Sequence, residues 1–147
     1  MELINQQLIW TDAKLRNKNE VFESVCNLLE AEGRLYDRQL FLHDLYQREE
    51  AGPTAPGYSF ALPHAKSKGV KHASLVLIHL REELAWTETE KVQYIFAIAV
   101  PEKEAGDRHL QILSMLARKM MREDFRQALE AAQTKEDYLQ LFTDIDE

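Results

Sequence analysis

Residues 73–80 read ASLVLIHL and residues 92–100 read VQYIFAIAV, and these two runs decide the fold. Each run has the length of a β-strand and is almost continuously apolar, which is the pattern of a strand that is covered on both faces. Helices must therefore lie on both sides of the sheet that these strands form. The segments around them predict an α/β fold, a mixed sheet of about five strands flanked by helices on both faces.

The segments outside these runs alternate between extended and helical patterns. A short strand at residues 8–10 is followed by apolar residues that recur at helical spacing and stop at Gly33. Asn17 or Asn19 can cap this helix. A second helix begins near Asp37 and ends before Gly52. The other predicted elements are a short strand at 58–62, stopped by Pro63, and three helices that begin near Asp107, Asp124 and Thr134.

Length, composition and charge restrict the class of protein. The chain has 147 residues, of which 45% are hydrophobic and 29% charged, so we expect a single domain over residues 1–147. No signal-peptide pattern and no apolar run of about 18 residues occurs, which predicts a cytoplasmic protein without direct membrane insertion. The net charge of −7 repels phosphate backbones, so we expect no nucleic-acid partner and favour basic proteins. The sequence leaves the oligomeric state open.

The five histidines differ in their sequence context. His43 and His72 are interpreted as surface residues, whereas His79 shares strand parity with two leucines and is expected in the core. No two histidines lie four residues apart on a helix, so we expect no metal site and no cofactor. Cys26 has no second thiol to pair with and is predicted to be a small buried hydrophobe in a reducing compartment.

His64 combines a fixed backbone with an exposed position. Pro63 restricts the chain beside it, and a short strand there runs into the polar stretch HAKSKG. A neutral imidazole is a nucleophile near physiological pH and needs no strong base to activate it. His64 is therefore a candidate nucleophile, and a loop-end histidine that only packs is the alternative.

Two further side chains could act on an anion near His64. His109 lies in the first turn of a predicted helix, on the face that also carries Leu113 and Leu116, where free N–H groups and the helix dipole favour negative charge. A buried histidine bonded to a carbonyl is the alternative for this residue. Arg48 ends the second predicted helix and could equally be a solvated charge paired within it.

Taken in order, these residues resemble a known family. Arg48-Glu49, Pro53-Thr54, a glycine-containing turn and then residues 60–64 (FALPH) are similar to the RE…T…G…A-[IL]-P-H signature of enzyme IIA domains of the fructose/mannitol type, from the bacterial sugar phosphotransferase system. The resemblance continues through residues 84–86, 92–101 and 109–113 and so covers essentially the whole chain.

The resemblance implies a phosphoryl carrier. Its histidine would accept a phosphoryl group from an HPr-type phosphocarrier protein and pass it to a cysteine of an enzyme IIB domain for carbohydrate uptake. His64 matches that histidine, while His109 and Arg48 match the residues expected to contact the phosphoryl group. The stretch at 58–60 and Ala65 depart from the usual pattern, in which glycine is frequent. The resemblance also implies the IIA sandwich fold.

Two rival functions share this resemblance. One is a regulatory protein of the nitrogen-related branch, whose His64 phosphorylation state controls a protein partner; the other is a binding module that has kept the fold but not the phosphorylation. Glu49 is expected to orient Arg48, because an imidazole that attacks through its unprotonated nitrogen needs no base. Phe60, Ala61 and Ala65 are expected to supply an apolar docking surface beside His64.

Overall fold

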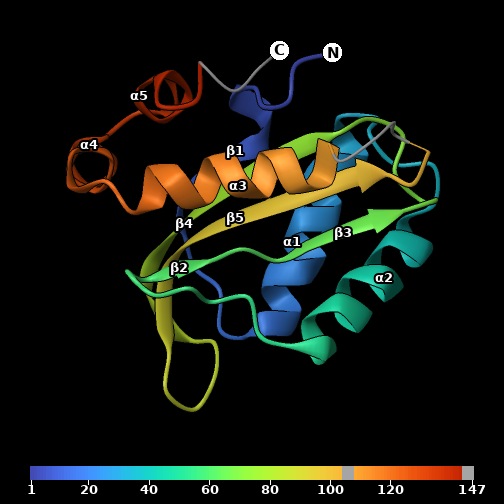
Figure 1. Ribbon diagram of the computed structural model, residues 1–147, viewed down its shortest axis with the longest axis horizontal. Coiled ribbons are helices and arrows are strands. Elements are labelled where there is room, and N and C mark those ends of the chain that lie inside the picture. The colour runs from blue at the N-terminus through green and yellow to red at the C-terminus, as the bar shows by residue number, and fades with distance from the viewer. Residues whose placement is uncertain (104–107, 144–147) are drawn as a thin grey trace.

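The computed structural model describes residues 1–103 and 108–143, which form helices and strands around one sheet (Figure 1). The strands are β1 (Ile9–Ala13), β2 (Phe60–Ala61), β3 (His64–Ser67), β4 (Ser74–Ala85) and β5 (Lys91–Pro101). The helices are the 3-10 turn η1 (Gln6–Leu8), α1 (Lys18–Ala31), α2 (Arg38–Ala51), α3 (Arg108–Met120), α4 (Glu123–Ala131) and α5 (Lys135–Gln140). Within the described ranges, no helix is both long and apolar enough to traverse a membrane.

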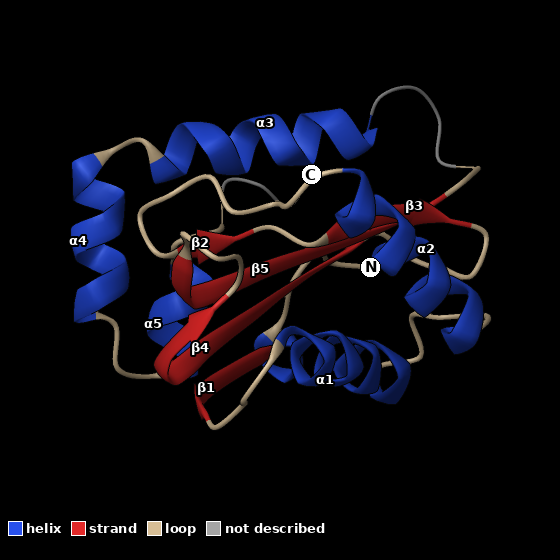
Figure 2. Ribbon diagram, turned by 90° about the horizontal axis from the view of Figure 1, so that it is seen from below, coloured by secondary structure: helices blue, strands red, loops and turns tan. Residues whose placement is uncertain are grey.

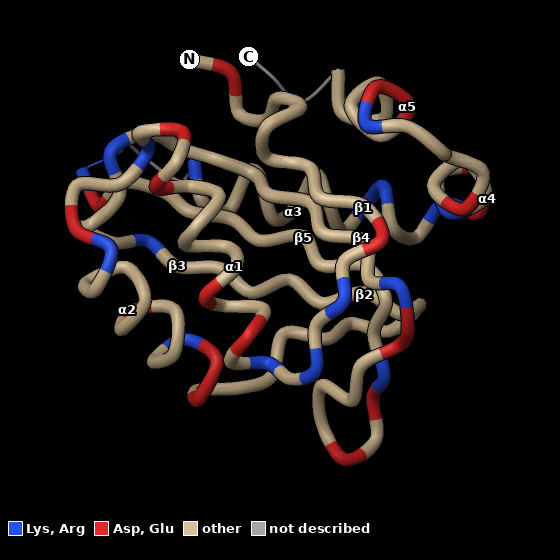
Figure 3. The backbone as a smooth tube through the Cα atoms, turned by 180° about the vertical axis from the view of Figure 1, so that it is seen from behind, with Lys and Arg blue, Asp and Glu red and all other residues tan. Residues whose placement is uncertain are grey.

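The sheet has five strands in the order β1-β4-β5-β2, with β3 also paired to β5. β4 and β5 are antiparallel, while β1 is parallel to β4 and both β2 and β3 are parallel to β5. The two long apolar runs of the sequence are the central strands, and in Figure 3 the charged residues of β4 and β5 lie outside these runs, toward the strand ends. The predicted mixed α/β sheet is confirmed.

Helices cover both faces of the sheet (Figures 1 and 2). α1 and α2 lie on one face, α3 crosses the other, and α5 packs against β1. Polar caps explain where three of these helices begin: Asn17 accepts from the amide of Glu20, Asp37 from that of Leu40, and Thr134 forms a capping box with Asp137. The expected start of α3 near Asp107 lies outside the described residues.

β2 and β3 form one edge of the sheet with a break at Pro63. Phe60 lies opposite Tyr94 and His64 lies opposite Ile98, so the partners stay 34 positions apart across the break. Pro63 has no N–H to donate to the ladder, yet its carbonyl still accepts from the amide of Ile98 at 3.0 Å. The expectation that the strand stops at Pro63 is confirmed, since β2 ends at Ala61, but the polar stretch after Pro63 then resumes the same register as β3.

Candidate functional site

A cavity of about 440 Å³ opens where the end of α2, β3 and the start of α3 meet. Arg48, His64, Lys66, Glu102 and His109 are among the residues that line it. The three residues predicted from the sequence, His64, His109 and Arg48, thus come from three different elements and face one space. Their convergence follows from the β3 register and from the crossing of α3 over the sheet.

His64 is held in a single tautomer by the backbone beside it. Its side chain is buried, and Nδ1 lies 2.7 Å from the carbonyl oxygen of Leu62. A carbonyl can only accept, so Nδ1 carries the proton and Nε2 keeps its lone pair. Burial lowers the pKa of His64 from its ordinary value of 6.5, opposed by the Leu62 hydrogen bond, while the Arg48 charge lowers this pKa further. The neutral, nucleophilic form is therefore favoured.

His109 lies against His64 at the start of α3. The ring centroids are 4.9 Å apart and the planes make an angle of 46°. Nε2 of His109 is buried and has no hydrogen-bond partner within residues 1–103 and 108–143. Burial lowers the pKa of His109, and the charges of His64, Lys66 and Arg48 act in the same direction. A buried polar nitrogen without a partner costs folding free energy, and a bound ligand could supply the missing hydrogen bond.

His109 lies on the face of α3 that packs toward the sheet, as the spacing of the buried apolar residues indicates. Ile112, Leu116 and Met120 are buried on the same face, three, seven and eleven residues beyond His109. The expected inner face is confirmed, with Ile112 more deeply buried than Leu113.

Arg48 is exposed at the last turn of α2, and its Nη1 donates to the carbonyl of Gly52 at 3.0 Å. A guanidinium has five N–H donors, so this contact holds the group in place while engaging one of them. The expectation that Glu49 orients Arg48 is wrong. The Glu49 carboxylate is buried and instead accepts hydrogen bonds from Thr54, Trp86 and Lys18.

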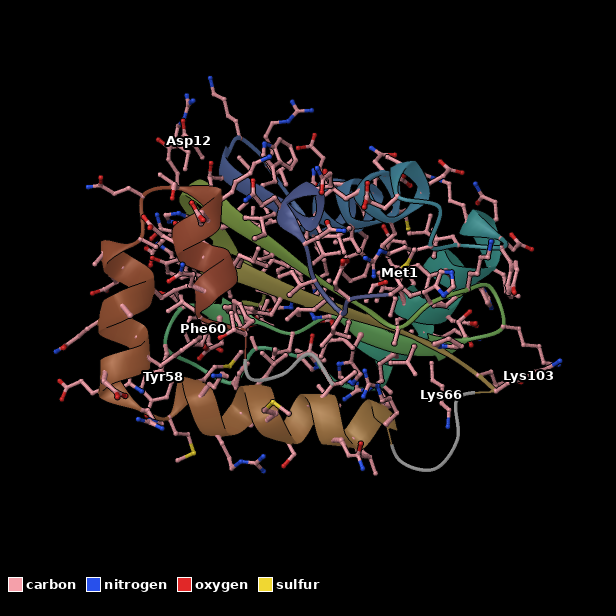
Figure 4. The ribbon with its side chains drawn as sticks, turned by 90° about the horizontal axis from the view of Figure 1, so that it is seen from above. Met1, Asp12, Tyr58, Phe60, Lys66 and Lys103 are labelled. Atoms are coloured by element: carbon pink, nitrogen blue, oxygen red, sulfur yellow. The ribbon has the colours of Figure 1, made fainter. Side chains whose placement is uncertain are left out.

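Lys66 also lines the cavity and was missed by the sequence analysis. His64 begins β3, so a residue two positions later points to the same side of the strand. Figure 4 shows the exposed Lys66 side chain beside the start of α3. The sequence HAKSKG was interpreted as polar loop, and alternate residues point to the same side only in a strand. The pairing of Lys66 with His64 was therefore not predicted.

The surface near His64 differs from the expected apolar patch. Phe60, Ala61 and Ala65 are all buried, and Phe60 packs edge-on against Phe96 in the core. They cannot provide an exposed docking surface, so that expectation is wrong. The cavity is instead lined by charged side chains, and the exposed Leu110 directly follows its lining residue His109.

The remaining histidines and the cysteine lie away from this cavity. His43 is exposed and His72 half-buried, while the half-buried His79 shares a 2.7 Å hydrogen bond with the hydroxyl of the buried Tyr138. Cys26 is buried, and burial raises the pKa of its thiol to about 12. Among the described residues, no group of three or more histidine, cysteine, aspartate or glutamate side chains is arranged to hold a metal ion.

Comparison with known families gives a match over residues 2–145 to the family described as "Phosphoenolpyruvate-dependent sugar phosphotransferase system, EIIA 2". Curated relatives include an EIIABC component of Escherichia coli described as specific for 2-O-alpha-mannosyl-D-glycerate, 30% identical over 97% of this chain and 22% of the relative. Multiphosphoryl transfer protein 2 of the same organism is 35% identical over 86% of this chain and 15% of its own length. The chain thus spans less than a quarter of these relatives.

Shorter relatives and solved structures match over most of their length. The nitrogen regulatory protein of Pseudomonas aeruginosa is 30% identical over 88% of this chain and 84% of its own. The crystal structure of IIA-Ntr from Neisseria meningitidis has a TM-score of 0.81 at 28% identity and covers 96% of this chain and 97% of its own. An enzyme IIA mannitol from Escherichia coli, solved in complex with phosphorylated enzyme IIB mannitol, shares the fold with a TM-score of 0.78 at 21% identity, over 94% of this chain and 95% of its own.

Proposed function

Because the chain belongs to the EIIA 2 family of the phosphoenolpyruvate-dependent sugar phosphotransferase system, we propose that it carries a phosphoryl group on Nε2 of His64. The family supports either a phosphoryl carrier for sugar uptake or its nitrogen-regulatory variant. The proposed donor is an HPr-type phosphocarrier protein, and the proposed acceptor is a cysteine of an enzyme IIB domain. The IIB domain found bound to a mannitol IIA protein supports the second half of this scheme.

The observation that carries the proposal is the hydrogen bond from Nδ1 of His64 to the carbonyl of Leu62. With the proton held on Nδ1, the lone pair of Nε2 is available to attack phosphorus. The attack forms an N–P bond as the bond between phosphorus and the donor breaks, and no proton has to leave the attacking nitrogen. In onward transfer the N–P bond breaks as an S–P bond forms on the acceptor thiolate.

The other residues of the cavity would stabilise charge. Phosphoryl transfer requires little beyond alignment of the attacking atom and stabilisation of charge on the phosphoryl oxygens. Arg48 and Lys66 would supply positive charge, and His109 would donate to a phosphoryl oxygen through its otherwise unpartnered Nε2. This role gives the buried nitrogen of His109 the partner that the unphosphorylated protein lacks among the described residues.

Phosphorylation by a purified donor tests the proposal. Incubation with phosphorylated HPr should add one phosphoryl group that is labile to acid and stable to alkali, which is the behaviour of an N–P bond. His64→Ala should accept none, whereas His43→Ala, which changes an exposed histidine of α2, should accept one as the wild type does. Stoichiometric phosphorylation of His64→Ala would refute the assignment.

The nitrogen-regulatory role is the second candidate. It is supported by the 30% identity to a nitrogen regulatory protein and by the likeness to IIA-Ntr at a TM-score of 0.81. Both candidates use His64, so phosphorylation alone does not separate them. Rapid transfer from the phosphorylated chain to an enzyme IIB cysteine would support transport, and its absence, together with phosphorylation-dependent binding of a regulator, would support regulation.

A further inference from the structure

A buried carboxylate follows the cavity residue Arg48 in sequence and is held by residues from three other segments of the chain. Oε1 of Glu49 accepts from the hydroxyl of Thr54 at 2.7 Å, and Oε2 accepts from the indole N–H of Trp86 at 2.9 Å and from Nζ of Lys18 at 3.0 Å. The backbone amide of Thr54 also donates to Oε2, at 3.3 Å. Glu49, Thr54 and Trp86 are all less than a tenth exposed. A carboxylate this well satisfied holds its partners rigidly.

The hydrogen bonds continue from this carboxylate to the nucleophile. The carbonyl of Thr54 accepts from the amide of Leu62 at 2.7 Å, and the carbonyl of Leu62 accepts from Nδ1 of His64 at 2.7 Å. Pro63 restricts the backbone of Leu62, and the carbonyl of Pro63 is itself held by the amide of Ile98. The direction of the Leu62 carbonyl is therefore set on one side by the sheet and on the other by Thr54.

We propose that Glu49 is a positioning residue that keeps the proton of His64 on Nδ1, acting through Thr54 and Leu62. The proposal rests on the proposed function of His64 as the phosphoryl acceptor. It adds the hydrogen bonds that fix the reactive tautomer of this histidine. Trp86 and Lys18 donate to the same carboxylate, so the residue that follows β4 and the start of α1 contribute to a site whose cavity they do not line. The proposal also gives the Glu49, Thr54 and Trp86 positions of the sequence motif a physical role.

The tautomer matters because only one nitrogen of His64 faces a fixed acceptor. If Thr54 shifts, Leu62 loses the bond that orients it, and the imidazole can exchange its proton between Nδ1 and Nε2. Molecules protonated on Nε2 have no lone pair there and cannot accept a phosphoryl group at that atom. Glu49 also raises the pKa of His64 by its charge, so loss of that charge should lower this pKa further.

The test measures the tautomer directly in the unphosphorylated protein. Nitrogen-15 NMR of the imidazole distinguishes Nδ1–H from Nε2–H, and HPr-dependent phosphorylation is timed in parallel. Glu49→Gln removes the charge, and Thr54→Val removes the hydroxyl at nearly constant shape. Glu50→Gln is the matched control, since it makes the same chemical change at an exposed neighbour.

We expect Glu49→Gln and Thr54→Val to increase the Nε2–H tautomer of His64 and to slow phosphorylation by about 2- to 12-fold, the effect of losing one hydrogen bond. Glu50→Gln should change neither quantity. Thr54→Ser keeps the hydroxyl and should therefore show the tautomer and the phosphorylation rate of the wild type. If Glu49→Gln does not fold, Trp86→Phe removes a single donor to the same carboxylate and answers the question.

Folded variants with the wild-type tautomer and rate would overturn the proposal. A lower thermal stability with an unchanged tautomer would also overturn it, because it would reduce Glu49 to a structural residue. The proposed function is refuted by a different result, a wild-type protein that accepts no phosphoryl group. The tautomer measurement would still decide whether Glu49 acts on His64.

Discussion

Replacement of His109 by phenylalanine should separate the stability of the protein from its activity. Nε2 of His109 is buried without a hydrogen-bond partner among the described residues, so the native fold bears the cost of its desolvation. A phenyl ring removes that polar atom, and the adjoining cavity leaves room for the larger side chain. The free energy of unfolding should therefore stay unchanged or rise by up to about 1 kcal/mol.

His79→Phe is the matched comparison, because it makes the same substitution in β4, outside the cavity. His79 stacks on Tyr94 at 4.5 Å and shares a 2.7 Å hydrogen bond with the hydroxyl of Tyr138, which is 2% exposed. Its replacement would leave a buried hydroxyl without that partner, so the free energy of unfolding should fall by about 1–3 kcal/mol. The two substitutions are chemically identical, and the structure predicts opposite effects.

The effects on phosphoryl transfer should be reversed. Loss of one charge-assisted contact costs about 1.5–3 kcal/mol, so His109→Phe should slow transfer by roughly 10- to 150-fold. His79→Phe, once folded, should transfer at the wild-type rate. Urea denaturation and stopped-flow transfer measure the two quantities. A His109→Phe protein that is markedly destabilised, or one that transfers normally, would show that the unpartnered nitrogen is not reserved for the phosphoryl group.

Three other predictions concern the same cavity. Arg48→Ala should slow transfer by about 10- to 150-fold and Arg48→Lys by less, because a point charge lacks the planar fork of a guanidinium; equal rates for both variants would contradict this. Because the pKa of His64 is lowered in the folded protein, the unfolding free energy should begin to decline as the pH falls below 6.5, whereas the transfer rate should decline only at the lower pH at which folded His64 binds its proton, as denaturation and pH-dependent kinetics would reveal. Lys66→Gln should raise the pKa of His109 in an NMR titration, whereas Lys68→Gln, whose lysine does not line the cavity, should leave it unchanged.

The sheet and its helices could be predicted because their signals are local. Two apolar runs specify the central strands, and the polar residues Asn17, Asp37 and Thr134 specify helix starts through their own hydrogen bonds. The break at Pro63 could be predicted, but the resumed pairing after it could not, because loss of one N–H interrupts a ladder without changing the register that neighbouring residues maintain.

The contacts of the site were harder to predict because they join segments that are distant in sequence. Glu49 stands next to Arg48, which suggested a direct pair, but its partners Lys18 and Trp86 lie 31 and 37 positions away. Phe60 and Ala65 were expected at the surface because they lie near His64 in sequence, yet Phe60 packs against Phe96 and Ala65 lies in β3, which packs against α2. Tyr58 has a positive φ of 57°, a conformation in which glycine is favoured, which explains why glycine is frequent there in the family pattern.

The pairing of His64 with Ile98 has a consequence for how partners would distinguish the proposed phosphorylated protein from the unphosphorylated one. An acceptor built into a sheet edge, beside a strand whose Ile98 is fully buried, has little freedom to move when it gains a phosphoryl group. Its backbone amides should show the same slow hydrogen exchange before and after modification. The added group brings roughly two negative charges to an otherwise unaltered surface. A partner would then sense charge and not shape, and proteins that bind one state should compete for the same face with proteins that bind the other.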